Sequence, residues 1–155
     1  MRLYHVAAVG FLIALPALRA HAAWEYTEWG MTPEQVVNAS HGSVKLLPPN
    51  EQQKNDEMKM ITKVGGDYTD GDLHVHIKFG FSTLTDKLEM VGYEVTDPKQ
   101  NDLLIAWLTK KYGPPAQKSG IETIGYHTYA WEQPDDIMLG ITKGTAAFVM
   151  QSQLR

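Results

Sequence analysis

Residues 73–81 alternate strictly between apolar and polar or small side chains, and this pattern constrains the fold more than any other feature. The apolar positions are Leu73, Val75, Ile77, Phe79 and Phe81. Because successive side chains of a β-strand point to opposite faces, the spacing predicts a strand with one buried face and one solvent-facing side. Such a strand belongs in an antiparallel sheet that is covered on one face only.

The surrounding residues predict a hairpin and further antiparallel strands. Residues 60–69 and 72–81 flank Asp70-Gly71, a pair favoured in two-residue hairpin turns because both turn positions need positive φ. A slip in the alternation near Val91-Gly92 predicts a bulge in the next strand. Residues 43–57 are polar and lack a period, so we expect a mobile loop there. The further strands are expected at residues 88–95, about 123–132, 137–142 and 145–151.

Two helices are predicted, each from a capping residue followed by proline. Thr32-Pro33 begins the first, with Gln35 placed to complete a capping box, and Asp97-Pro98 begins the second. These elements predict an α+β fold, an antiparallel sheet with helices packed on one face. Each predicted helix ends at a glycine and is followed by strands, which suggests a possible distant internal duplication.

Two short motifs resemble a known group of proteins. Gly30-Met31-Thr32-Pro33-Glu34-Gln35-Val36 is similar to the helix entry of small exported domains of the type of β-lactamase inhibitory protein and the small lipoprotein of the outer-membrane barrel-assembly machinery. Lys111-Tyr112-Gly113-Pro114 resembles the helix exit of such domains. The resemblance implies helices on one face of an antiparallel sheet and a function in binding proteins, without catalytic residues.

The first residues have the organisation of a cleavable signal peptide. Met1-Arg2 is followed by an apolar run over residues 6–18 and by Ala20-His21-Ala22. The run contains Pro16 and is shorter than the roughly 20 apolar residues of a membrane-spanning helix. We therefore expect a signal peptide at residues 1–22, one α+β domain at residues 23–155, a periplasmic or secreted location and no membrane span.

Charge and cysteine content narrow the classes of partner. The chain has 14 basic and 18 acidic residues, and without residues 1–22 it would carry a net charge near −6. Its lysines are scattered rather than clustered, which argues against nucleic acid and against an anionic membrane surface. The chain contains no cysteine. It therefore has no disulfide, no thiolate metal ligand and no cysteine for a lipid anchor.

One strand carries a possible metal site. His74 and His76 share the polar side of the predicted strand, and a loop at Asp70-Gly71 would set Asp67 opposite His74 and Gly65 opposite His76. Two imidazoles and a carboxylate would suit zinc or copper. Alternating polar residues opposite an apolar face are also typical of the solvated side of a sheet. A second, separate hint is Met58-Lys59-Met60, because thioethers favour cuprous copper, although methionine also fills gaps in cores.

The remaining motifs do not indicate catalysis. No Gly-x-Ser-x-Gly elbow or phosphate-binding glycine loop occurs, and Asp135-Asp136 has the character of a turn. The four tryptophans are expected mainly in the core. We therefore expect a non-catalytic interaction module that needs no cofactor and binds a protein, with its open sheet face and residues 43–57 as contacts. The alternative is a periplasmic metal-binding protein that uses Asp67, His74 and His76.

Overall fold

We describe the protein from a computed structural model, which places residues 22–153. The predicted signal peptide therefore lies outside the described residues except for Ala22. Within residues 22–153 the chain forms a nine-stranded antiparallel sheet and a two-stranded one. The strands of the large sheet are β3 (Val44–Leu46), β4 (Gln53–Asn55), β5 (Met60–Asp70), β6 (Leu73–Ser82), β7 (Leu88–Val95), β8 (Gln117–Ile121), β9 (Tyr126–Trp131), β10 (Asp136–Thr142) and β11 (Phe148–Ser152).

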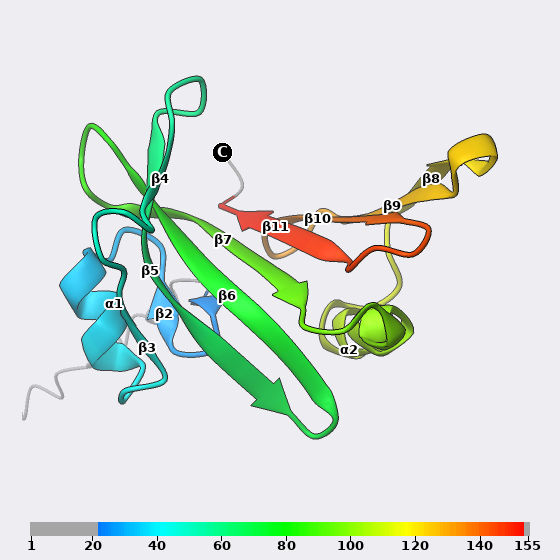
Figure 1. Cartoon of the computed structure of the whole chain (residues 1–155), viewed down its shortest axis with the longest axis horizontal. Coiled ribbons are helices and arrows are strands. Elements are labelled where there is room, and N and C mark those ends of the chain that lie inside the picture. Colours follow the sequence, from blue (N-terminus) through cyan, green and yellow to red (C-terminus); the bar gives the residue numbers. More distant parts are fainter. Residues whose placement is uncertain (1–21, 154–155) are drawn as a thin grey trace, which may run out of the picture.

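The large sheet consists of two groups of strands, and the last strand of each group, β7 or β11, pairs with the last strand of the other. Its order is β3-β5-β6-β7-β11-β10-β9-β8, with β4 paired to β5 beside β3. The first group thus runs from β3 to β7 and the second from β8 to β11, each through consecutive antiparallel neighbours (Figure 1). Strands β7 and β11 join the groups antiparallel, with Tyr93 opposite Val149 and Gly92 opposite Met150. The centre of the sheet is therefore a junction between elements distant in sequence.

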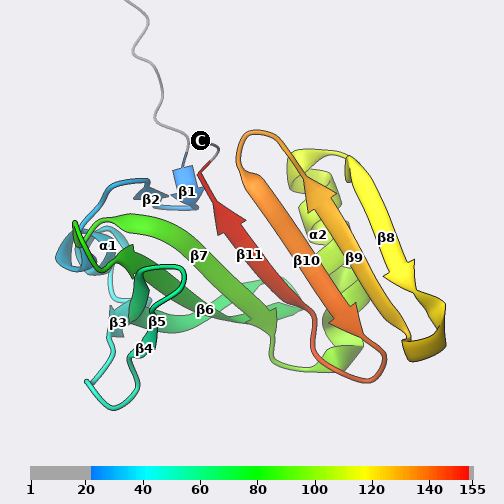
Figure 2. The same ribbon diagram turned by 90° about the horizontal axis from the view of Figure 1, so that it is seen from above.

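A short helix precedes each group of strands. Helix α1 (Pro33–Ala39) begins at the predicted capping box, in which Thr32 and Gln35 bond each other's backbone N–H groups. Asp97 caps a 3₁₀ turn, η1 (Pro98–Gln100), which leads into α2 (Asn101–Tyr112). Figure 2 shows α1 beside the first group and α2 behind β9 and β10. The α+β class is confirmed, with a larger sheet and shorter helices than the sequence suggested.

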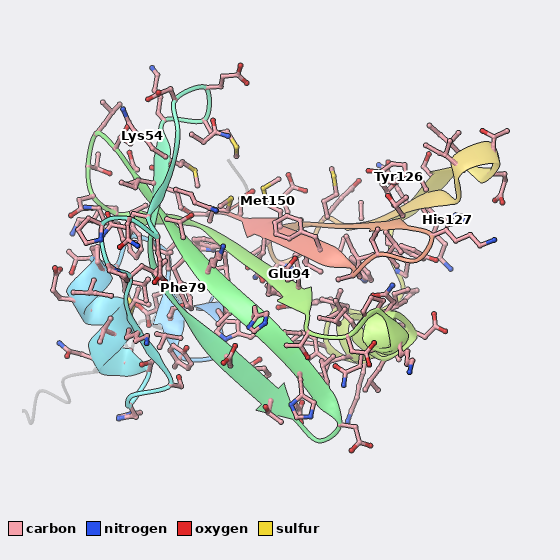
Figure 3. All side chains as sticks on the ribbon, viewed as in Figure 1. Lys54, Phe79, Glu94, Tyr126, His127 and Met150 are labelled. Atoms are coloured by element: carbon pink, nitrogen blue, oxygen red, sulfur yellow. The ribbon has the colours of Figure 1, made fainter. Side chains whose placement is uncertain are left out.

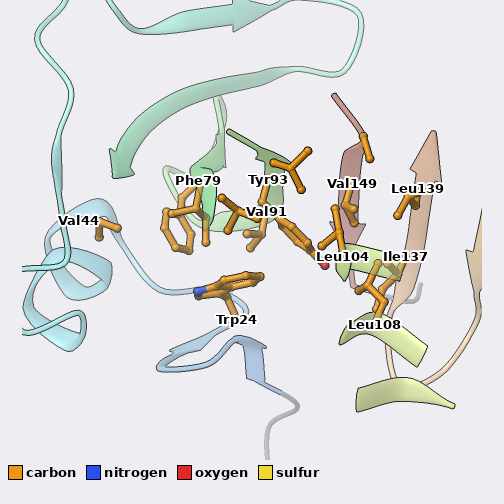
Figure 4. Packing of buried hydrophobic residues seen from close by; sticks show 14 of the residues in the cluster. Trp24, Val44, Phe79, Val91, Tyr93, Leu104, Leu108, Ile137, Leu139 and Val149 are labelled. Carbon is orange, nitrogen blue, oxygen red and sulfur yellow. The ribbon is translucent and has the colours of Figure 1, made fainter. Parts of the chain in front are cut away.

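The hydrophobic core lies between the sheet and the helices. We call this side of the sheet the covered face; it carries the alternating residues Val75, Ile77 and Phe79, all almost fully buried. Trp24, from the small β1 (Ala22–Trp24) and β2 (Thr27–Glu28) hairpin, packs 4.6 Å from the Tyr93 ring, centroid to centroid. Figure 4 shows Trp24 against this face, with Leu104 and Leu108 of α2 near Ile137. The N-terminal hairpin therefore closes the core that the two helices leave open.

Several local predictions were wrong. The hairpin loop is Gly71-Asp72 rather than Asp70-Gly71, because Asp70 pairs with Leu73 and Gly71 takes the positive φ of 58°. The predicted bulge does lie in β7, but at Glu89, since Gly80 pairs with Met90 and Phe81 with Leu88, rather than at Val91-Gly92. Residues 43–57, expected as a loop, contain β3 and β4, and the strand β8 was not predicted. Apart from the buried Val44 of β3, these strands have exposed side chains and pair with the sheet mainly through their backbone.

The segment described here includes no helix with the length and apolar character needed to cross a membrane.

Candidate functional site

The face of the sheet opposite the core, which we call the open face, has glycines near its centre on three strands, and side chains of neighbouring residues lie over them. Gly80 pairs with Met90, Gly92 with Met150, and Gly140 with Phe148 across neighbouring strands. A glycine leaves the space above the backbone free for the side chains of its neighbours. The centre of this face can therefore hold large side chains that lie flat, with room between them.

A hollow of about 1010 Å³ opens on this face, and methionines supply most of its apolar lining. We call it the methionine hollow. Figure 1 shows β4 and the start of β5 rising on one side and β10 and β11 extending on the other, with β7 between them. The residues that line the hollow are Glu57, Met58, Met60, Glu89, Met90, Asp136, Met138, Met150, Ser152 and Gln153.

The methionines of the hollow are brought together by strand register. Met138 of β10 is directly opposite Met150 of β11. Met150 pairs with Gly92 of β7, which places Met90, two residues along the same strand, on its diagonal. Such diagonal neighbours are within reach of long side chains. Figure 3 labels Met150 on the upper side of β11, toward the β4–β5 arm.

The fourth methionine reaches the group over Gly80. A methyl group placed on Gly80 would lie 2.9 Å from the methyl carbon of Met60 and 3.0 Å from that of Met90. The ends of these two side chains therefore lie side by side above the glycine. A continuous band of thioether side chains thus runs from β5 across β6 and β7 to β10.

The charged side chains among the described residues that line the hollow are all acidic. Glu57, Glu89 and Asp136 are among its lining residues. Of the described residues that line it, none is a lysine, an arginine or a histidine. Carboxylates beside an apolar surface create a negative potential that favours cationic ligands or partner segments.

A smaller hollow of about 180 Å³ continues the open face toward β6. Met90 lines both hollows, and Phe148 lines the smaller one, where its ring carbons would lie 3.4 Å from a methyl group placed on Gly92. His76 and Lys78 of β6 and Glu94 of β7 also line it. The open face therefore changes from apolar and acidic at β10 to mixed charge at β6.

The three residues predicted as a metal site do not all meet. Because the hairpin loop is shifted by one residue, Asp67 pairs with His76 and its carboxylate contacts the imidazole of His76. His74 pairs instead with Thr69, whose Oγ1 lies 3.1 Å from His74 Nδ1. Among residues 22–153, no three histidine, aspartate or glutamate side chains are grouped closely enough to hold a metal ion. The predicted pairing of Asp67 with His74 was wrong.

One other prediction, about an acidic pair, also changes. We expected Asp135-Asp136 to be a simple turn, but Asp135 is only 1% exposed. Its carboxylate accepts hydrogen bonds from Trp29 Nε1 at 2.9 Å and from Gln151 Nε2 at 2.7 Å. Asp135 therefore links the start of the domain to its last strand. No local sequence pattern indicated this, because its partners are remote in the chain.

The aromatic residues belong mainly to the core, as predicted. Trp24 and Trp131 are almost fully buried, and Trp131 Nε1 donates to the Gly113 carbonyl oxygen at 2.8 Å. Burial raises the pKa of the Tyr93 hydroxyl well above its ordinary value. These residues stabilise the fold and lie away from the methionine hollow.

Comparison of the chain with protein-family models, with curated proteins and with solved structures found no match.

Proposed function

We propose that this protein is an exported, non-catalytic interaction module that binds a protein partner through the open face of its sheet. The observation that carries this proposal is the methionine hollow, a depression lined by methionines and carboxylates on the side of the sheet that no helix within residues 22–153 covers. Met138, which lines it, is 51% exposed, and Phe148, in the adjoining smaller hollow, is 46% exposed. Large apolar side chains that remain exposed together typify interaction surfaces.

Methionine suits such a surface because of its flexibility. Its unbranched side chain has three rotatable bonds and a polarisable sulfur, so a methionine surface can adapt to different apolar partners. The glycine positions beneath leave room for this adjustment. We infer that a partner inserts apolar side chains into the hollow.

The rim of the hollow adds a preference for charge. Glu57, Glu89 and Asp136 would attract a segment with basic residues beside its apolar ones. The partner we propose is therefore a protein segment that is both apolar and cationic. His76 and Lys78, on the adjoining mixed-charge part of the open face, would contact regions of the partner outside the hollow.

The location and origin of the module are part of the same proposal. We propose export on the basis of residues 1–22, and a periplasmic or secreted site of action. We also propose that the two halves arose by a distant duplication, since each consists of a helix followed by an antiparallel group of strands. In that account the partner binds at the junction of the two halves. The resemblance to small exported binding domains agrees with this function.

A metal-binding protein that uses the His-x-His strand is the second candidate function. Its specific support is the contact between Asp67 and His76. For a third ligand, His74 would have to turn away from Thr69. Zinc or copper binding that is lost in a His74→Ala, His76→Ala double variant would establish this function.

The main proposal is tested by photo-crosslinking in the producing cell. A benzoylphenylalanine residue is placed at position 138 on the open face or, as a matched control, at position 110 on the exposed side of α2. We expect a discrete protein adduct from position 138 that is absent from position 110. Adducts from position 110 alone, or none from either position, would contradict the proposal.

A further inference from the structure

The distribution of methionines in this protein is unusual in one respect. Of the six methionines in residues 22–153, five line the methionine hollow, and the sixth, Met31, packs against the core. Methionine ordinarily fills gaps inside a core. Here the covered face is built from aliphatic and aromatic residues, and the thioethers are gathered on the other side of the sheet.

The positions of these thioethers allow several of them to approach one point. Met138 and Met150 are cross-strand partners, and Met90 is diagonal to Met150. The methyl group of Met60 lies beside that of Met90 above Gly80. The four side chains come from four different strands, so the folded sheet, rather than a local sequence motif, gathers them.

We propose that the methionine hollow binds a soft monovalent metal ion, cuprous copper or its analogue silver, through the sulfur atoms of Met90, Met138 and Met150. Met60 is placed as a further ligand. Thioethers select cuprous copper over harder ions, and a borderline ion such as zinc prefers the imidazole and thiolate ligands that the lining of the hollow lacks. Glu57, Glu89 and Asp136 supply a negative potential that favours a cation.

This site differs from the one expected from sequence. His76 lines the smaller hollow and His74 lies beside Thr69, and neither is among the residues that line the methionine hollow. Of the Met58-Lys59-Met60 motif, only Met60 is a ligand candidate in the proposed site. Met58 lies on the rim of the hollow and is exposed. The inference does not rest on the proposed protein partner, because it depends on the sulfur atoms rather than on the apolar character of the surface.

The test is competition for cuprous copper between the purified protein and bicinchoninate under ascorbate, together with silver titration. We expect one ion per chain, and affinity at least a hundred-fold lower in a Met90→Leu, Met138→Leu, Met150→Leu variant. Leucine keeps the size and apolar character of the side chain but removes the sulfur. The Met31→Leu variant is the matched control and should bind as the original chain does.

Methyl resonances of ¹³C-labelled methionine give a second readout on the unaltered protein. Silver should shift the signals of Met90, Met138 and Met150 and leave that of Met31 in place. The proposal is overturned if the protein fails to compete for copper, if the triple variant binds equally well, or if binding is lost in a His74→Ala, His76→Ala variant instead. A Met90→Leu, Met150→Leu variant that carries benzoylphenylalanine at position 138 keeps an apolar hollow. It should therefore still form the adduct that the original sequence forms from position 138, so failure of the two proposals can be told apart.

Discussion

The two faces of the large sheet use apolar residues in opposite ways. On the covered face, Val75, Ile77 and Phe79 are almost fully buried, and Trp24 and the helices leave them little freedom. On the open face, Met138 and Phe148 are large and apolar yet about half exposed. The strands β10 and β11 that supply Met138 and Phe148 also supply the fully buried Leu139 and Val149, so strand preference does not explain the difference.

The contrast separates residues that stabilise the fold from residues that are available for binding. Aliphatic and aromatic side chains in a close-packed core contribute most of the stability of a domain. Flexible methionines above glycines contribute little to that stability. Their position is better explained by contact with something outside the chain, and each prediction below tests this division between the faces.

The largest expected difference is between truncation on the covered face and on the open face. Phe79→Ala should lower the free energy of unfolding by about 3–5 kcal/mol, because it leaves a cavity in the core. Met138→Ala, half exposed, should cost less than about 1 kcal/mol. Urea denaturation of both variants measures the comparison. Equal losses would show that the open face is part of the stabilising core.

Replacing a glycine by alanine on each face, at Gly66 and at Gly80 of neighbouring strands, tests the same difference between the covered and the open face. A Cβ atom on Gly66 would lie 2.5 Å from the Ser43 carbonyl oxygen, so Gly66→Ala must push β3 away and should cost about 2–3 kcal/mol. On Gly80 the nearest atoms are the flexible ends of Met60 and Met90. Gly80→Ala should therefore cost under about 1 kcal/mol. Thermal unfolding of the pair provides the measurement, and a reversed order would contradict this view of the open face.

A smaller effect is expected where the covered face contains a polar atom. The Tyr93 hydroxyl is buried, and within the described part of the chain it has no hydrogen-bond partner. Tyr93→Phe should leave the protein equally stable or more stable by up to about 1 kcal/mol at pH 7. A loss above about 1 kcal/mol would reveal a bond that this hydroxyl makes.

The same residue makes a prediction about alkaline pH. Burial raises the pKa of Tyr93 above 10.0, so the folded state keeps its proton when the unfolded chain releases it. Its contribution is fully present below pH 10 and is lost as the pH rises above that value. The free energy of unfolding should fall less steeply above pH 10 in Tyr93→Phe than in the original chain. Identical slopes in denaturation curves would contradict the assignment.

The smallest expected effect concerns zinc on the polar part of the open face. Asp67 and His76 together provide two ligands, fewer than the three or four of stable zinc sites. Calorimetry should show no saturable binding at micromolar zinc. Saturable binding that disappears in His76→Ala would instead support the metal-binding alternative and give this part of the face a role of its own.

Features of the fold that depend on residues close together in the sequence could be predicted, and features that depend on distant residues could not. The strand β6 and the capping box at Thr32 have strict local patterns and were found. The edge strands β3, β4 and β8 were missed because their side chains are mostly exposed and lack an apolar period. A shift of one residue in the Gly71-Asp72 loop was enough to change the partner of His74.

The candidate site itself was beyond local reasoning. Met58 and Met60 are close in sequence and gave a weak signal of soft-metal chemistry. Met90, Met138 and Met150 join them only through the pairing of β7 with β11 and of β11 with β10. The pairing of β7 with β11 connects the two halves of the chain. Because no turn or short loop joins these strands, no local sequence pattern predicts it. Trp131 and Val149, which could have been assigned to the same surface, lie on the covered face.

The central claim, that the open face is the binding surface, is tested most directly by measuring the crosslinked adduct from position 138 with and without Phe148→Glu. This change places a charge on the open face, in the smaller hollow that shares Met90 with the methionine hollow. Phe148 is half exposed, so the fold should be retained. We expect the adduct yield to fall about thirty-fold, the effect of losing one binding hot spot. An unchanged yield in a folded variant would contradict the claim.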